Sequence, residues 1–350
     1  MDEADGKGNG RRPGGRCGFP GRSSHGRRNG GGGERDGRKG RGIRLTGGKS
    51  RILSRPREAL SAGGSAPEIP GFWSFAFGIL PAGRERMPKT FLNGADLYYH
   101  IEGSGAPLIL VHGLGMDHTM WDSQISIFSR DYQVITYDLR GHGRSEAPDR
   151  PSTLDTFADD LDQLLHFLGL RRATVLGLSL GGRIALRFAL KFSRQVEALI
   201  LADAQSDTPA ASGERFRDLA RMARREGMEK TAEVFFSLPS LQGLAKRNPS
   251  RWEKEKKRFS RTSVAGWANA CLAIAEMKPM NDHLSSVSAP TLAMAGEEDE
   301  AYLPYLELYL QKIPRCQKEL VPRAGHMSNL ENPEAFNRAV LSFLEGREKN

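Results

Sequence analysis

Cysteine is scarce in this chain. The 350 residues contain three cysteines, Cys17, Cys271 and Cys316, which are too few and too far apart for a disulfide framework. The sequence has no Cys-x-x-Cys pair and no cluster of cysteines and histidines with metal-ligand spacing. These absences exclude the disulfide-rich and zinc-finger classes, predict no bound metal, and fit a reducing compartment.

Long hydrophobic runs are also missing. The first apolar run, Gly71 to Leu80, is too short to span a bilayer and lies too far along the chain to be a signal peptide. We therefore expect a cytoplasmic protein with no membrane partner.

The positive charge of the chain is confined to one end. The formal net charge is +9, but residues 1–86 alone carry 18 Lys+Arg and 8 Asp+Glu, and residues 87–350 carry a net charge of −1. The overall charge is therefore no sign that the larger part binds nucleic acid. Such binding is expected only through residues 1–86, which are predicted to be a disordered basic extension. Its first 50 residues are mostly Gly, Arg and Lys.

Met87 precedes the first globular pattern and suggests a second interpretation of residues 1–86. Arg84-Glu85-Arg86 is what a purine-rich ribosome-binding site would encode if it were translated. We therefore expect Met87 to be the natural start, in which case residues 1–86 are not part of the natural protein. Residues 87–350 are long enough to form one domain with a substantial core.

From Met87 onward, short apolar runs alternate with helical patterns. Two strands joined by an Asn93-Gly94 turn are followed by runs typical of strands buried on both faces. Residues 154–168 are predicted to be helical, because Phe157, Leu161 and Leu164 share one face. The alternation predicts an α/β fold with a mostly parallel sheet flanked by helices. The strands are predicted at Lys89–Leu92, Asp96–Ile101, Leu108–Val111, Val134–Tyr137, Thr174–Leu176 and Ala198–Leu201.

The alternation stops after Asp203. Residues 205–281 are helical in pattern and highly charged, with few β-branched residues, so we expect a helical insertion that acts as a lid. The α/β pattern then resumes with strands at Thr291–Ala295 and Glu319–Val321 and helices near Tyr302–Ile313 and over Glu334–Leu344.

The segment Gly177-Leu178-Ser179-Leu180-Gly181-Gly182 lies between an apolar strand and an amphipathic helix. A sharp strand-to-helix turn forces its central residue into a strained conformation and exposes that side chain above the sheet. Residues two positions away must be small, and both are glycine. Ser179 is therefore the candidate nucleophile, and the N–H of Leu180 is a candidate donor to an oxyanion.

A serine hydroxyl needs an adjacent base to act as a nucleophile near neutral pH. Of the histidines after Ser179, His326 follows the last strand, whereas His283 has no strand leading to it, so His326 is the candidate base. Asp299 follows the strand before that and is the candidate that orients the histidine. Asp203, which follows an earlier strand, is the competing acid.

A second oxyanion donor is expected in the loop after the third strand, which reads His112-Gly113-Leu114-Gly115. Gly113 allows the backbone to turn inward, and the N–H of Leu114 is the candidate donor. His112 is expected to hold the loop by hydrogen bonds and not to react.

Candidate pocket residues come from the next helix and from the lid. Trp121 and Trp267 are the candidate substrate-binding aromatics, and the alternative is that both are core residues. Arg221 and Arg225 are candidates to hold a carboxylated substrate, and the alternative is a solvated helix face.

With these motifs, the chain from about Met87 to Gly346 resembles the α/β-hydrolase family. The motifs are His112-Gly113, the stretch Asp138-Leu139-Arg140-Gly141-His142-Gly143-Arg144-Ser145, the turn at Ser179 and the closing Gly325-His326. The resemblance implies that the Asp138–Ser145 stretch is a structural turn beneath the site.

Within that family the chain is most similar to the 3-oxoadipate enol-lactonase and carboxylesterase group. The similarity includes Gly177–Ala185, Gly266-Trp267-Ala268-Asn269-Ala270-Cys271 and His326-Met327-Ser328-Asn329-Leu330-Glu331. The predicted function is hydrolysis of a small carboxylic ester or lactone through an acyl-enzyme, without a metal or cofactor.

Other functions would use the same residues. A carbon–carbon bond hydrolase or a cofactor-free perhydrolase would need the same three side chains, and a binding protein of this fold would keep them without turnover. The sequence predicts neither the natural substrate nor the oligomeric state.

Overall fold

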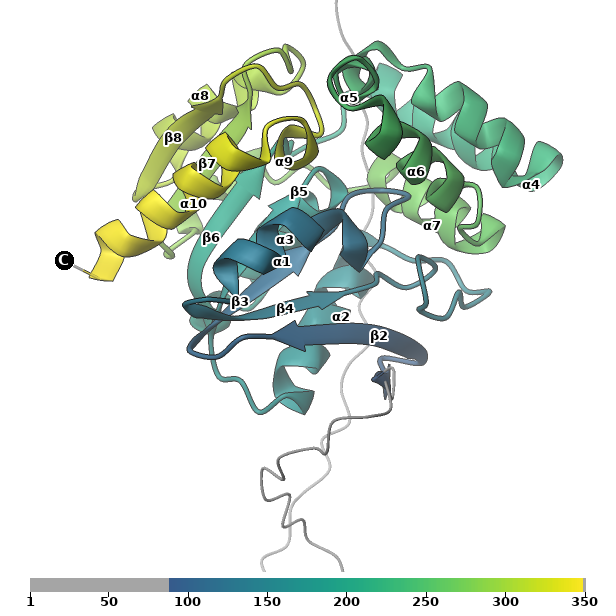
Figure 1. Cartoon of the computed structure of the whole chain (residues 1–350). Helices are drawn as coiled ribbons and strands as arrows, with labels where there is room; N and C mark the ends of the chain where they lie inside the picture. Colours follow the sequence, from purple (N-terminus) through teal and green to yellow (C-terminus); the bar gives the residue numbers. More distant parts are fainter. Residues whose placement is uncertain (1–87, 349–350) are drawn as a thin grey trace, which may run out of the picture. The chain divides into compact units, whose positions relative to one another are not determined.

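Figure 1 shows the computed structural model of the chain, which describes residues 88–348. The predictions of disorder and of a natural start at Met87 concern residues outside the described range. In the part that is described, no helix combines the length and the apolar character needed to cross a membrane.

Residues 88–348 contain an eight-stranded sheet with the strand order β1-β2-β4-β3-β5-β6-β7-β8. β2 is antiparallel to β1 and β4, and all other neighbours are parallel. β5 and β7 are buried along their whole length, as expected for apolar strands covered on both faces. The strands are β1 (Lys89–Leu92), β2 (Ala95–Glu102), β3 (Ala106–Val111), β4 (Tyr132–Tyr137), β5 (Ala173–Leu178), β6 (Val196–Ala202), β7 (Thr291–Gly296) and β8 (Cys316–Val321).

Helices flank this sheet, and the predicted α/β fold is confirmed. α1 packs against α10, α2 packs against α3, and α8 packs on β7 and β8 (Figure 1). α2 begins at a capping box formed by Thr153 and Thr156 and buries Phe157, Leu161 and Leu164. The helices are α1 (Asp122–Phe128), α2 (Leu154–Phe167), α3 (Leu180–Lys191), α8 (Leu303–Lys312), α9 (Ser328–Glu331) and α10 (Pro333–Glu348), with short 3-10 turns at His118–Trp121, Ser193–Gln195, Pro239–Leu241 and Asn281–Ser286.

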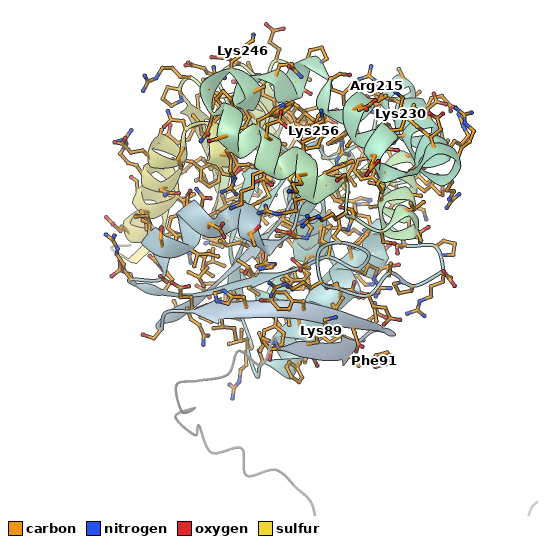
Figure 2. All side chains as sticks on the ribbon, turned by 45° about the vertical axis from the view of Figure 1, so that its right-hand side comes forward. Lys89, Phe91, Arg215, Lys230, Lys246 and Lys256 are labelled. Atoms are coloured by element: carbon orange, nitrogen blue, oxygen red, sulfur yellow. The ribbon has the colours of Figure 1, made fainter. Side chains whose placement is uncertain are left out.

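The insertion between β6 and β7 is helical, as predicted for residues 205–281. Its helices are α4 (Ala210–Phe236), α5 (Gln242–Arg247), α6 (Pro249–Phe259) and α7 (Val264–Ala275), drawn in green in Figure 1. Gly227, with a φ of +81°, interrupts α4. Figure 2 shows basic side chains on these helices, among them Arg215 and Lys230 on α4 and Lys256 on α6.

Candidate active site

Ser179 occupies the sharp turn between β5 and α3. Its φ of +56° and ψ of −112° are strained for a residue with a side chain. A Cβ on Gly177 would lie 2.1 Å from the carbonyl oxygen of Gly181, and a Cβ on Gly181 would lie 2.0 Å from that of Val111. The two glycines therefore let strand and helix approach closely enough to hold the Ser179 side chain beyond the end of β5.

Ser179, His326 and Asp299 form a continuous line of hydrogen bonds. Nε2 of His326 lies 3.0 Å from Oγ of Ser179, and Nδ1 of the same ring lies 2.8 Å from Oδ2 of Asp299. Asp299 is 2% exposed and His326 is 9% exposed, so water competes little for these bonds. The three side chains follow β5, β7 and β8, whose parallel arrangement brings their carboxyl ends to one edge of the sheet.

Glu297 and Glu298, which precede Asp299 in the same loop, and His283, the other histidine downstream of Ser179, are not part of this line of hydrogen bonds. Glu297 accepts a hydrogen bond from the N–H of Arg323, and Glu298 forms an ion pair with Arg247. His283 is exposed on its 3-10 turn. The arrangement is the one expected for His326 as the base.

Asp203, the competing acid, is fully buried beside the same histidine but is not its hydrogen-bond partner. Its Oδ1 accepts the N–H of Gly296 at 2.9 Å, and its Oδ2 accepts the hydroxyl of Ser328. One nitrogen of His326 and one oxygen each of Asp203 and Asp299 lie within 4.8 Å of one another. Burial, and then the charge of Asp299, raises the pKa of Asp203 well above its usual range.

The surroundings of His326 favour its protonated form. Burial lowers the pKa of this imidazole, but Tyr302, Asp299 and Asp203 together outweigh burial, and the net shift is upward from the ordinary value of 6.5. The ring of Tyr302 lies against the imidazole, with the two ring centroids 4.4 Å apart. The site is therefore suited to stabilise the imidazolium that forms when His326 accepts a proton.

The first predicted oxyanion donor, the N–H of Leu180, lies at the start of α3. Backbone N–H groups in the first turn of a helix lack intrahelical partners, and the helix dipole makes this end attractive to negative charge. Leu180 directly follows Ser179, so its N–H is available beside the nucleophile.

The second predicted oxyanion donor, the N–H of Leu114, belongs to the peptide group between Gly113 and Leu114. A Cβ on Gly113 would lie 3.8 Å from Cβ of Ser179, so this loop passes beside the nucleophile. The Gly113 carbonyl accepts hydrogen bonds from Nδ1 of His112 at 2.8 Å and from the N–H of Met116 at 3.2 Å. The C=O and N–H of a trans peptide point in opposite directions. The two bonds to the Gly113 carbonyl therefore also fix the direction of the Leu114 N–H, which points away from that carbonyl.

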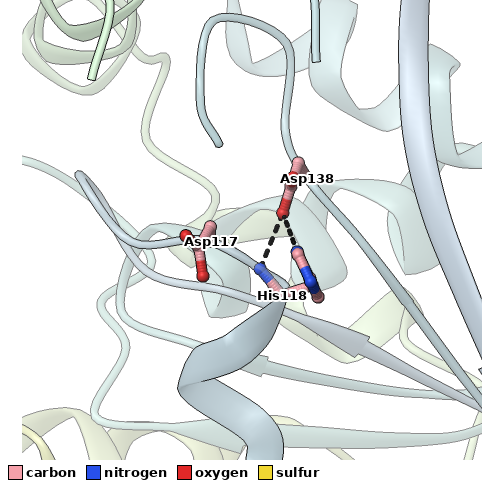
Figure 3. Close-up of side chains that lie close together, drawn as sticks. All are labelled: Asp117, His118 and Asp138. Carbon is pink, nitrogen blue, oxygen red and sulfur yellow. Dashed lines mark hydrogen bonds and ion pairs between the residues drawn. The ribbon is translucent and has the colours of Figure 1, made fainter. Parts of the chain in front are cut away.

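Asp117, His118 and Asp138 form a second buried cluster (Figure 3). Asp138 accepts hydrogen bonds from the backbone N–H and Nδ1 of His118, both at 2.7 Å, and from the N–H of Arg144 at 2.8 Å. Asp117 caps the following turn through the N–H of Thr119. The carboxylates are engaged in hydrogen bonds that fix the loops next to the site, so the cluster is a structural brace, as the resemblance implied for the Asp138–Ser145 stretch.

A cavity of about 160 Å³ lies beside Ser179 and His326, between the sheet loops and the insertion. The sheet side contributes Gly113, Leu114, Met116, Met120, Leu178, Ala301, Tyr302 and Met327, and the insertion contributes mainly apolar residues, namely Phe216, Leu219, Phe235, Leu238, Leu241 and Ile274.

Trp121 and Trp267, predicted to bind substrate, do not line this cavity, and that prediction is wrong. Both are fully buried. Trp267 packs inside the insertion against Phe235 and Phe259, with ring centroids 5.0 and 4.6 Å away, and Trp121 packs on Phe336. Both indoles face the core side of their helices, so they are the core residues of the alternative interpretation.

Arg183 and Arg215, which no sequence motif indicated, line the cavity. Arg183 is 3% exposed, and its Nη1 donates to the carbonyl of Asp207 at 2.6 Å and to Oγ1 of Thr208 at 2.9 Å. Arg215 lies on α4 (Figure 2). Within residues 88–348, neither arginine forms an ion pair with a carboxylate.

The two arginines that were predicted to meet a substrate carboxylate are already paired with acidic side chains. Arg221 forms ion pairs with Glu214 and Asp218, and Arg225 pairs with Glu226.

Arg183 could have been found from the sequence, because it lies one helical turn after Ser179 and so shares its face of α3.

A sequence profile of the α/β hydrolase fold matches residues 106–333. 3-Oxoadipate enol-lactonase 2 of Acinetobacter baylyi is 32% identical over 239 residues, which are 68% of this chain and 88% of that protein. The crystal structure of the enol-lactonase from Burkholderia xenovorans LB400 matches with a TM-score of 0.69 and 30% identity, over 74% of this chain and 100% of that one. A thermophilic esterase from Thermogutta terrifontis, solved with malate bound, matches with a TM-score of 0.69 and 32% identity, over 74% and 98% of the two chains.

Proposed function

The chain belongs to the α/β-hydrolase family, and from that premise we propose that it is a serine hydrolase that cleaves a small carboxylic ester or lactone through an acyl-enzyme. One observation carries the proposal: the hydrogen-bonded line Ser179–His326–Asp299 meets a cavity beside the predicted oxyanion donors. The similarity to enol-lactonases and an esterase supports the same class of bond.

In this mechanism His326 Nε2 accepts the proton of Ser179 as Oγ attacks the carbonyl carbon. The N–H groups of Leu114 and Leu180 hold the negative charge that develops on the carbonyl oxygen. The ester C–O bond then breaks, and His326 returns the proton to the leaving alkoxide or enolate. Water attacks the acyl-enzyme with His326 again as the base, the acid is released, and Ser179 regains its proton.

Asp299 acts on the histidine and not on the substrate. Its hydrogen bond to Nδ1 keeps the proton on that nitrogen, so that Nε2 faces Ser179 as an acceptor. Its charge stabilises the imidazolium between the two proton transfers. These steps use three side chains, two backbone N–H groups and water.

The substrate is further proposed to carry a carboxylate. The cavity is lined by Arg183 and Arg215, and none of the side chains that line it is Asp or Glu. The insertion, residues 205–281, holds 15 Lys+Arg and 9 Asp+Glu, and this surplus of positive charge attracts anions. We infer that the insertion acts as the lid over such a substrate. The cytoplasmic location of the protein stays a prediction.

Covalent labelling tests the proposal. A fluorophosphonate should label the wild-type protein at Ser179 and should not label Ser179→Ala, and the wild type should hydrolyse p-nitrophenyl acetate. A screen of short acyl esters, small lactones and esters of dicarboxylic acids then defines the substrate. A protein that is labelled but cleaves no ester or lactone would point to carbon–carbon or peracid chemistry, and one that is neither labelled nor active would be a binding protein.

A further inference from the structure

Asp203 connects the two loops that carry Asp299 and His326. It follows the end of β6 with a φ of +46°, a value that few residues with a side chain adopt. Its side chain is fully buried and reaches Gly296, three residues before Asp299, and Ser328, two residues after His326. A strained backbone at a buried carboxylate is retained only where the surrounding contacts determine it.

We propose that Asp203 is a positioning residue, which ties the acid loop (residues 296–299) to the histidine loop (residues 324–328) and so fixes the Asp299–His326 hydrogen bond. The inference rests on the proposed function. It assigns Asp203 no contact with the substrate and no role as the acid of the triad.

The two loops are packed closely enough for such a tie to control them. A Cβ on Gly296 would lie 2.2 Å from the carbonyl oxygen of Gly325 and 2.3 Å from that of Ala324. The N–H of Glu298 donates to the Ala324 carbonyl at 2.9 Å. A shift of either loop therefore changes the distance between Asp299 and His326, and catalysis is sensitive to shifts of about 1 Å.

The contacts of Asp203 explain why the orienting acid is Asp299. Both carboxylate oxygens of Asp203 already have donors, whereas Oδ2 of Asp299 is bonded to Nδ1 of His326. An asparagine at 203 would keep both links, because its oxygen accepts from Gly296 and its amide group donates to the Ser328 hydroxyl. Alanine would remove both links and leave the Gly296 N–H without a partner.

The test compares Asp203→Asn, Asp203→Ala and Ser328→Ala with the wild type on one ester. We expect Asp203→Asn to keep kcat within about threefold, and Asp203→Ala and Ser328→Ala to lower kcat by about 10- to 100-fold with little change in KM. Ser206→Ala is the matched control: Ser206 is also fully buried, but its hydroxyl donates to Asn281, which lies in neither loop. Its kcat should stay at the wild-type level.

A second readout does not depend on turnover. The Nδ1 proton of His326, shared with Asp299, should give a downfield proton NMR signal that is present in the wild type and Asp203→Asn and lost or broadened in Ser328→Ala. Ser328→Ala serves if Asp203→Ala does not fold. If the wild type hydrolyses no ester, the proposed function fails, while the NMR signal still decides the role of Asp203.

Two results would overturn the inference. Wild-type kcat and an unchanged downfield signal in both Ser328→Ala and Asp203→Ala would mean that the ties do not hold the loops. A loss in Asp203→Asn as large as that in Asp299→Asn would mean that Asp203 acts as an acid of the triad and not as a positioning residue.

Discussion

Nδ1 of His112 lies 2.8 Å from the carbonyl oxygen of Gly113, and the same histidine accepts the N–H of Leu139 at its Nε2 at 2.9 Å. The second bond leaves the ring proton on Nδ1, so His112 donates to Gly113. The bond fixes the peptide plane whose other end is the N–H of Leu114. His112 therefore influences the oxyanion site without reaching the reacting atoms.

We predict that His112→Ala lowers kcat by about 10- to 100-fold and changes KM much less. The peptide plane between Gly113 and Leu114 would lose one of its two fixing bonds, and an oxyanion donor out of position mainly affects the transition state. Steady-state kinetics on p-nitrophenyl acetate measure the effect, and thermal unfolding checks that the variant is folded. His100→Ala, at a partly exposed position on β2, is the control and should behave as the wild type. A normal kcat in His112→Ala would show that the bond does not matter.

The rate should rise with pH through the pKa of His326. Only the neutral imidazole accepts the Ser179 proton, and the net pKa shift of His326 is upward, so the half-maximal point of kcat/KM should lie above pH 6.5. Asp299→Asn removes a negative charge next to the ring, so this point should move to lower pH, and kcat should fall by roughly 10⁴-fold. The rate of fluorophosphonate labelling, measured against pH, gives the half-maximal point for the wild type and for Asp299→Asn. Steady-state kinetics on p-nitrophenyl acetate give the change in kcat.

Glu298→Gln is the matched control for Asp299→Asn. Glu298 is the adjacent carboxylate, is about half exposed and pairs with Arg247 and not with His326. Its pH profile should coincide with that of the wild type. A profile of Asp299→Asn that also coincides with the wild type would contradict the assignment of the acid.

Arg215 should select for substrates with a carboxylate. For the p-nitrophenyl ester of a dicarboxylic acid, Arg215→Ala should lower kcat/KM by about tenfold, because one charge-assisted hydrogen bond contributes about 1.5 kcal/mol. For p-nitrophenyl acetate the same change should have little effect. Arg221→Ala on the same helix removes a side chain that is paired with Glu214 and Asp218, and it should leave both rates unchanged. Equal losses on both esters in Arg215→Ala would argue against a carboxylate site.

The sheet could be predicted because its central strands are apolar without interruption. The strand predicted at Leu108–Val111 lies within β3, and that at Thr291–Ala295 matches β7 to one residue. The last strand was predicted only at Glu319–Val321, whereas β8 begins at Cys316. β8 is an edge strand with mostly exposed side chains, so hydrophobicity does not mark its start.

The three residues of the hydrogen-bonded line could be predicted, but the wall of the cavity could not. Ser179, Asp299 and His326 each follow a strand. Because parallel strands have their carboxyl ends at one edge of the sheet, residues that follow them lie near one another, independently of how the insertion packs. The cavity wall depends on how the helices of the insertion pack, which local patterns do not determine. For that reason Trp267 was assigned to the pocket although it packs in the core, and Arg183 was missed although it lines the cavity.

The brace at Asp138 should make stability depend on pH. Burial raises the pKa of Asp138, but the hydrogen bond and charge of His118 outweigh burial, and the net shift is downward. A carboxyl group with a lowered pKa stabilises the fold at pH values above its unfolded pKa, near 3.8, and this contribution is lost as the pH falls through the lower folded value.

Asp138→Asn should therefore lower the free energy of unfolding by about 1–3 kcal/mol at pH 7, because the bonds from His118 and Arg144 lose their charged acceptor. The difference from the wild type should narrow as the pH falls below about 4. Urea unfolding at several pH values measures it, and Asp122→Asn, at a site that is 46% exposed, is a control expected to stay within about 0.5 kcal/mol. Equal stabilities of Asp138→Asn and the wild type at pH 7 would mean that the cluster in Figure 3 does not brace the loops beside Ser179.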